Sequence, residues 1–219
     1  MIEIAKSVVL IVSALFPIVN PLGGSPIYLA LTRDYSAPAR RALSRQIAFN
    51  SFFLLMGSYF IGTHILAFFG ISIPVVQVGG GLVVITTGWA MLKRRDEDDR
   101  TEMRGGGPPC DPLRQAFYPL TLPLTVGPGS ISVAITLGAN APRHLAFPYT
   151  LVAAILGSLL IALSVFLCYG FADRLARALG ATAMSVIMRL SSFLLVCIGV
   201  QILWNGASAL LSSVVIHTR

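Results

Sequence analysis

The chain has 219 residues, of which 55% are hydrophobic and only 11% are charged, and its mean hydropathy is +0.80. A soluble globular domain carries about 25% charged residues, so this composition excludes one and indicates an integral membrane protein. The net charge of +7 raises the question of a nucleic-acid partner, but 13 of the 16 basic residues fall in three loops of the predicted topology. The charge therefore reports orientation in a lipid bilayer, and no nucleic-acid partner is expected.

Apolar runs long enough to cross about 30 Å of hydrocarbon recur along the chain. They predict six membrane spans, at residues 5–32, 44–70, 74–92, 117–140, 146–170 and 187–211. The three basic loops follow spans one, three and five, and the positive-inside rule places them in the cytoplasm with both termini outside. The first run is expected to remain as a span, because it continues to Thr32 without a clean signal-peptide cleavage site.

A Gly/Pro/Ser interruption, here called the first break, lies inside the first span at Asn20-Pro21-Leu22-Gly23-Gly24-Ser25-Pro26. Glycine and proline at membrane depth free backbone groups that lipid cannot satisfy, so such breaks persist mainly where the chain lines a cavity. Serine is a favoured N-cap and proline suits the first helical position. A new half-helix is therefore predicted to begin at Ser25-Pro26.

The fourth span carries a second break, at Thr125-Val126-Gly127-Pro128-Gly129-Ser130. A half-helix is predicted to begin at Gly127-Pro128, with Gly129 and Ser130 in its first turn. A lone break is most simply structural, because small residues also mark close helix packing. Two matched breaks in corresponding halves instead indicate a transporter binding site.

The two breaks belong to a predicted internal repeat. Residues 1–94 and 115–219 each hold three spans, and a charged, Gly/Pro-rich cytoplasmic linker at 95–114 joins them. Downstream of the breaks, Ser36-Ala37-Pro38 is matched by Asn140-Ala141-Pro142. Because three is an odd number, the second half enters the membrane from the opposite side. This predicts an all-helical membrane protein of two inverted three-helix repeats, with helices 1 and 4 discontinuous.

Inversion lets the free N–H groups of the two half-helices converge at mid-membrane, where a small anion or carboxylate would bind. Glycines there let a substrate approach the backbone, and Asn, Ser and Thr side chains supply partners for the ammonium group of a zwitterion. The predicted substrate-binding residues are Asn20, Pro21, Gly23, Gly24, Ser25, Thr125, Gly127, Pro128, Gly129 and Ser130.

None of the nine acidic residues lies well inside a predicted span. Proton-coupled carriers often use a buried carboxylate, so uncoupled or Na⁺-linked transport is favoured over a carboxylate relay. The identity of any coupling ion, Na⁺ or H⁺, stays open, as does the oligomeric state. The three cysteines show no metal spacing or disulfide framework, and neither a cofactor nor a metal site is expected.

The segment from Asn20 to Thr32 resembles the N-P-[IL]-G-x-x-P-[IV]-[FY]-L-x-L-T signature of MarC proteins, and Pro123 to Ile131 resembles their P-L-T-x-G-P-G-[AS]-I signature. The resemblance covers nearly the full length. It implies a six-span prokaryotic inner-membrane protein, related to LysE-type exporters, that transports small neutral amino acids such as glycine and alanine. One departure is Gln77, where many relatives carry Arg, while Arg189 keeps the basic residue in the other half.

Together these features predict a membrane transporter of small neutral amino acids that binds its substrate between broken helices. The alternatives are a channel or exporter for another small metabolite, or a non-transporting scaffold or regulatory protein. An intramembrane enzyme is not expected, because no catalytic set of residues lies at membrane depth.

Overall fold

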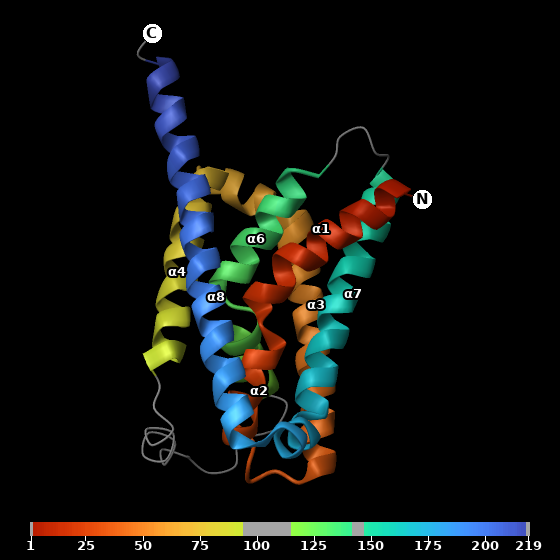
Figure 1. Ribbon diagram of the computed structural model, residues 1–219. Coiled ribbons are helices and arrows are strands. Elements are labelled where there is room, and N and C mark those ends of the chain that lie inside the picture. The colour runs from red at the N-terminus through yellow and green to blue at the C-terminus, as the bar shows by residue number, and fades with distance from the viewer. Residues whose placement is uncertain (1, 94–114, 142–146, 218–219) are drawn as a thin grey trace.

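The computed structural model describes residues 2–93, 115–141 and 147–217, and these ranges form helices and short connections with no strand among them. The helices are α1 (Ile2–Val19), α2 (Pro21–Leu31), α3 (Ala37–Phe68), α4 (Ile73–Lys93), η3 (Ala116–Thr125), α6 (Pro128–Ala139), α7 (Phe147–Gly170) and α8 (Ala172–His217) (Figure 1). The predicted all-helical fold is confirmed. The predicted linker at 95–114 lies outside the described residues.

Helices of membrane-spanning length account for the predicted spans. Five are apolar and long enough to cross a bilayer: Ile2–Leu31, Ala37–Phe68, Ile73–Lys93, Phe147–Gly170 and Thr182–Ser213. A sixth crossing results if η3 and α6, which meet at 70°, count as one span. The last helix begins earlier than predicted, because residues from Ala172 onward are already helical and the backbone then turns at Gly180, where φ is 77°.

Two long-range pairings frame the bundle. Helix α3 lies beside α7, and α4 runs along α8 (Figure 1). The approach of α4 to α8 is close because glycines meet there: a Cβ built at Gly81 would lie 2.6 Å from the backbone nitrogen of Leu203. Helix α6 packs between α3 and α4, and α1 packs against α7.

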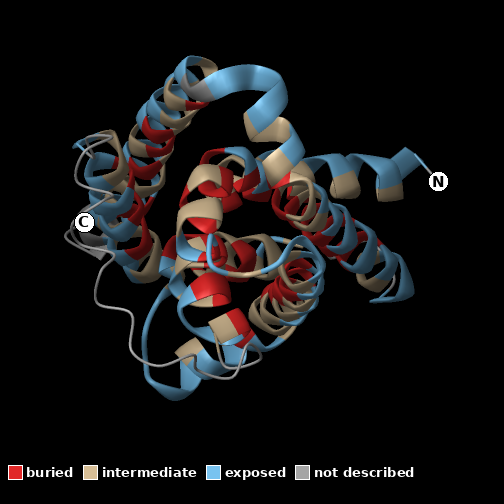
Figure 2. Cartoon of the chain, turned by 90° about the horizontal axis from the view of Figure 1, so that it is seen from below, coloured by how far each residue is buried: buried red, intermediate tan, exposed pale blue. Residues whose placement is uncertain are grey.

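The apolar core lies where α1, α2, α3, η3, α6 and α7 meet, and Figure 2 shows the buried residues turned toward the middle of the bundle. Each of these helices contributes at least one fully or nearly fully buried side chain, among them Leu15, Tyr28, Leu55, Leu120, Ala134 and Val165. Large apolar side chains also cover the outside, and Phe53 is 55% exposed. In a bilayer such an outer face meets lipid chains, so its exposure is the expected state of a membrane protein.

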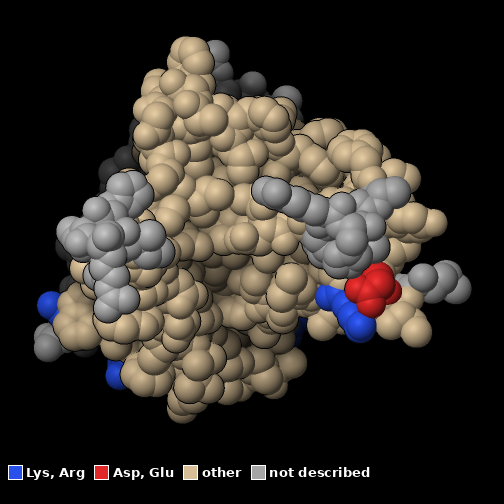
Figure 3. All heavy atoms as spheres, turned by 90° about the horizontal axis from the view of Figure 1, so that it is seen from above, with Lys and Arg blue, Asp and Glu red and all other residues tan. Residues whose placement is uncertain are grey.

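Basic side chains gather at one end of the bundle. Arg33 lies between α2 and α3, Lys93 ends α4, and Arg174 follows α7, and these connections share the lower end of Figure 1. The opposite face, seen in Figure 3, is almost uncharged over its described part, and Lys6 pairs with Glu3 at 2.8 Å. The positive-inside rule predicts that the basic end faces the cytoplasm.

Arg40, at the start of α3, links several elements at this basic end by hydrogen bonds. Its Nε and Nη2 donate to Oδ2 of Asp173 in α8 at 3.1 and 2.7 Å. Its Nη1 donates to the carbonyl oxygens of Thr32 and Tyr35, at 3.3 and 3.0 Å. One guanidinium, only 16% exposed, therefore joins the α2–α3 connection to the start of α8.

Arg40→Lys is expected to lower the unfolding temperature by several degrees. A compact ammonium cannot reproduce the planar fork of the guanidinium, and hydrogen bonds to charged groups contribute about 1.5–3 kcal/mol when fully formed. Fluorescence-monitored unfolding in detergent measures the shift. Arg33→Lys is the matched control, since the Arg33 side chain is 69% exposed and lies 3.9 Å from Asp34. Equal shifts in the two variants would contradict the prediction.

Candidate functional site

The first break is an interruption at Asn20. Asn20 is left-handed (φ 47°, ψ 57°) and is the one non-glycine residue with positive φ in the described part of the chain. Asparagine tolerates this conformation because its short side chain bonds locally, and here its Oδ1 accepts from the Gly23 N–H at 3.1 Å. Helix α2 then begins at Pro21, which has no N–H to satisfy.

The prediction that this half-helix begins at Ser25-Pro26 is wrong, because both residues lie inside α2. The Ser25 hydroxyl is buried and donates to the carbonyl oxygen of Pro21 at 2.8 Å. It also lies 3.3 Å from the carbonyl oxygen of Cys168 in α7. Asn20 is the actual cap, since asparagine combines a capping oxygen with tolerance of the left-handed turn that the chain makes there.

The predicted start of the second half-helix is confirmed. Helix α6 begins at Pro128 with Gly127 as its N-cap. The Ile131 N–H makes the first backbone bond, to the carbonyl oxygen of Gly127 at 3.1 Å. The N–H groups of Gly129 and Ser130 therefore precede the intrahelical ladder.

The segment before the second break is not a regular helix. In η3 the turns are wide, and the Val126 N–H reaches back to the carbonyl oxygen of Thr121 at 2.8 Å. Pro119 and Pro123 lie inside this segment and each removes a backbone donor, which prevents an ordinary α-helical ladder. Wide turns of this kind occur frequently at functional sites.

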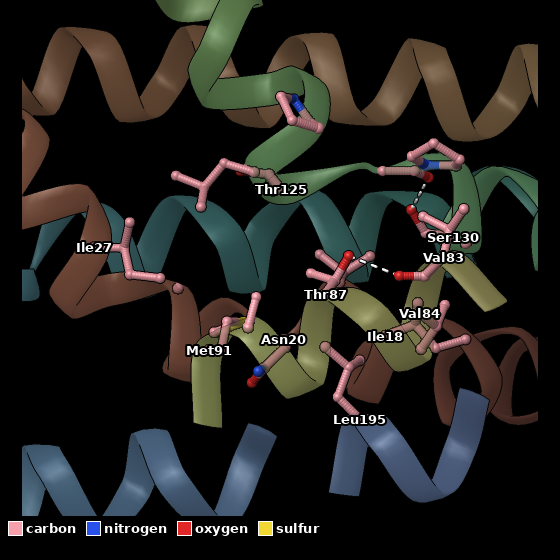
Figure 4. Close-up of a pocket in the computed structure, with 18 of the residues that line it drawn as sticks. Ile18, Asn20, Ile27, Val83, Val84, Thr87, Met91, Thr125, Ser130 and Leu195 are labelled. Carbon is pink, nitrogen blue, oxygen red and sulfur yellow. Dashed lines mark hydrogen bonds between the residues drawn. The ribbon is translucent and has the colours of Figure 1, made fainter. Parts of the chain in front are cut away.

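A cavity of about 660 Å³ lies between the two breaks (Figure 4). Its walls come from α1, α2, α4, η3 and α6, and Leu195 of α8 also lines it. From the breaks it extends to Leu31 and Met91, in the last turns of α2 and α4, and hence toward the basic end.

Seven of the ten predicted site residues line this cavity: Asn20, Gly24, Thr125, Gly127, Pro128, Gly129 and Ser130. Pro21, Gly23 and Ser25 do not. Gly23 instead contacts the side chain of its own helix cap, and the Ser25 hydroxyl is turned into its own helix. Packing therefore brings two distant segments of the chain to one space.

The hydroxyls that line the cavity donate their hydrogen bonds to backbone carbonyl oxygens. Those of Thr87, Thr125 and Ser130 donate to carbonyl oxygens at 2.7, 2.7 and 2.9 Å, and the bonds of Thr87 and Ser130 are drawn in Figure 4. A hydroxyl has one proton and two lone pairs. Toward the cavity these side chains therefore act as hydrogen-bond acceptors.

Asn20 has the opposite polarity. Because its Oδ1 accepts from Gly23, its Nδ2 is left as the group that can donate elsewhere. Nδ2 is buried and has no hydrogen-bond partner among the described residues. A buried donor is costly to leave unpaired, and because Asn20 lines the cavity, Nδ2 is a candidate donor to an acceptor oxygen of a ligand.

Three residues at or behind the cavity have no local signal in the sequence. Thr86 and Thr87 line it from α4, and Tyr169, in the last turn of α7, lies 3.1 Å from Thr125 (Oη to Oγ1). A threonine pair or a tyrosine inside an apolar helix is common, and which face it occupies depends on how that helix packs. Only the three-dimensional arrangement identifies them.

Among the residues that the structure describes, no charged side chain lines the cavity. Gln77 lies elsewhere, with its Nε2 3.5 Å from Thr136 Oγ1 of α6, and Arg189 is exposed on α8. Within the described ranges there is no group of three or more His, Cys, Asp or Glu side chains that could hold a metal ion. The arrangement therefore fits an uncharged or zwitterionic ligand better than a strongly charged one.

The sequence model of the family described as MarC family integral membrane proteins matches residues 5–211. The chain belongs to the MarC family. It is 30% identical over 212 residues to the inner membrane protein MarC of Salmonella paratyphi B, which covers 94% of this chain and 96% of that protein. MarC proteins of Citrobacter koseri and Escherichia coli match with the same identity and coverage.

The names of these MarC relatives give a location, the inner membrane, and no substrate. They agree with the membrane-length helices of this chain. No solved structure matches the chain.

Proposed function

We propose that this MarC-family chain is a transporter of small neutral amino acids, which bind at mid-membrane between the two breaks. The observation that carries the proposal is the cavity that residues of both breaks line together. Irregular backbone in membrane proteins persists where it lines a cavity, and paired broken helices form substrate sites in transporters. The cavity is larger than one glycine or alanine, so the substrate occupies the part beside the breaks and the rest serves as an access path.

The hydrogen-bonding groups of the cavity complement a zwitterion. The Asn20 amide and the N–H groups at the start of α6 are donors suited to a carboxylate, and a helix N-terminus adds a favourable dipole. The oxygens of Thr87, Thr125 and Ser130 are acceptors suited to an ammonium group. A substrate with no net charge needs no counter-charge, and the described part of the wall offers none.

We also infer that the chain is built as two inverted three-helix repeats. The support is reciprocal packing between the halves: α2 contacts α8 as α6 contacts α4, and α1 contacts α7 as η3 contacts α3. Exchanging the two halves turns each contact into its counterpart. Inverted repeats let a transporter expose one site alternately to the two sides of the membrane.

The present conformation has its cavity on the side of the basic loops. Toward the other end, α6 packs so closely on α3 that a Cβ at Gly138 would run into the carbonyl oxygen of Tyr59. With basic loops in the cytoplasm, this conformation gives the substrate access from the cytoplasm. The opposite state requires α6 and α3 to separate.

Uptake into liposomes tests the proposal. Purified protein is expected to take up labelled glycine, alanine and serine saturably, with competition from unlabelled neutral amino acids and none from lysine or glutamate. Na⁺ and proton gradients are imposed separately, so that the coupling ion is read from the same assay. Phe53→Leu, on the exposed face of α3, is the control that keeps parental uptake.

Two results would overturn the proposal. One is uptake no greater than in empty liposomes, which favours a scaffold or regulatory role. The other is equal flux of neutral and charged solutes without saturation, which favours a channel.

A further inference from the structure

Tyr169 lies at the junction of the two breaks, although it does not line the cavity. It is 1% exposed in the last turn of α7. On one side its Oη is 3.1 Å from Thr125 Oγ1 of the second break. On the other side the same oxygen lies 2.5 Å from where a Cβ at Gly24 of the first break would be.

The direction of the Tyr169–Thr125 hydrogen bond follows from counting protons. The Thr125 hydroxyl donates its one proton to the carbonyl oxygen of Leu120 at 2.7 Å, and a carbonyl can only accept. Tyr169 must therefore be the donor to Thr125. Both bonds together fix the Thr125 side chain and leave one lone pair of its oxygen for the cavity.

The Tyr169 ring is itself held in place. It stacks on Tyr28 of α2, with ring centroids 4.6 Å apart and planes 9° apart. The Tyr28 hydroxyl donates to the carbonyl oxygen of Arg40 at 2.6 Å. Ser25 adds a contact one turn earlier, to the carbonyl oxygen of Cys168. Helix α2 is thus attached to α7 over successive turns, and the Tyr169 hydroxyl continues the attachment to η3.

We propose that Tyr169 is a positioning residue of the substrate site. Its hydroxyl holds Thr125 of the second break at a set distance from Gly24 of the first, so that both breaks present their groups to one substrate. The proposal rests on the proposed function, because the site it positions is the amino-acid site. Tyr169 acts through Thr125 and touches no substrate.

The kinetic test is a double-mutant cycle in the liposome assay. Tyr169→Phe is expected to raise the apparent KM for alanine roughly three- to tenfold, the range for one hydrogen bond, with little change in maximal rate. Thr125→Val should raise it as well, and Tyr169→Phe should add nothing in the Thr125→Val background. Thr125→Ser, which keeps the hydroxyl, should raise the KM less than Thr125→Val does. Tyr149→Phe is the control, since Tyr149 is 51% exposed on the same helix.

A steric test needs no transport. Gly24→Ala is expected to lower the unfolding temperature in detergent, because its Cβ meets the Tyr169 hydroxyl. In the Gly24→Ala/Tyr169→Phe pair the nearest ring atoms would lie at 3.4 and 3.5 Å, which are ordinary contacts. Removing one oxygen atom should therefore restore much of the lost stability.

The outcomes separate the two proposals. No amino-acid uptake by the parent protein would overturn the proposed function and with it the positioning role, whatever the steric test gives. The positioning role alone is overturned if the parent protein takes up amino acids but the KM increases of Tyr169→Phe and Thr125→Val multiply in the double variant. The positioning role is also overturned if Gly24→Ala lowers the unfolding temperature by the same amount with and without Tyr169→Phe.

Discussion

Gly129→Ala is expected to reduce alanine uptake roughly 5- to 150-fold, as overpacking costs about 1–3 kcal/mol, while leaving membrane insertion intact. A Cβ at Gly129 would collide with the Cγ2 atom of Val84 in α4. Gly129 lines the cavity in the first turn of α6, so any shift that relieves the collision displaces the N–H groups that we propose face the substrate. Initial uptake rates in liposomes, normalised to the reconstituted protein, measure the effect.

Val84→Ala supplies a rescue for this variant. It removes the colliding carbon, after which the nearest atoms to the new Cβ are Val84 Cβ at 3.5 Å and the Gly80 carbonyl oxygen at 3.6 Å. The double variant should therefore recover uptake that Gly129→Ala loses. Gly79→Ala is the matched control, since no described atom lies within 4 Å of a Cβ there. Equal losses at Gly79 and Gly129 would show that the effect comes from helix backbone and not from the cavity wall.

Asn20→Asp is expected to reduce alanine uptake roughly 10- to 150-fold, because a hydrogen bond to a charged group contributes about 1.5–3 kcal/mol. Aspartate keeps the oxygen that accepts from Gly23 and is an equally good cap, so α2 should still begin at Pro21. It lacks the Nδ2 donor and, when ionised, repels a substrate carboxylate. Uptake is measured at equal pH on both sides of the membrane, so that no proton gradient contributes to the difference.

The sign of the pH dependence separates the donor role from a structural one. As the pH falls, the Asn20→Asp carboxyl gains a proton and again has a donor, so uptake by the variant should rise relative to the parent. Asn20→Ala, which loses both cap and donor, should show no such recovery and should also unfold at a lower temperature. Parental KM in Asn20→Asp would exclude a role of the amide in binding.

The sequence is sufficient for the features that depend on local chemistry. Span positions follow from the length of apolar runs, and η3 with α6 occupies the span predicted at 117–140. The start of α6 at Pro128 follows because proline lacks an N–H and has a helical φ. The start of α2 does not follow, because Asn20 and Ser25 are both good caps and the choice depends on the left-handed turn that packing imposes at Asn20.

The site divides in the same way. Its glycines and prolines can be predicted from the sequence, because they interrupt helices in an apolar span. Thr87 and Tyr169 cannot be predicted as site residues, because their positions depend on which faces of α4 and α7 turn toward the breaks. The Arg40–Asp173 pair likewise joins residues from opposite halves of the chain.

By itself, then, the sequence determined a helical membrane protein of the MarC family with two breaks and a strong charge asymmetry. Composition, period and backbone chemistry are properties of short segments, and they need no knowledge of neighbours. Only the tertiary structure decided that both breaks line one cavity, that the Asn20 amide nitrogen is buried without a partner among the described residues, and that the Tyr169 hydroxyl lies between Gly24 and Thr125. These are distances between segments far apart in the chain, and helix packing sets them.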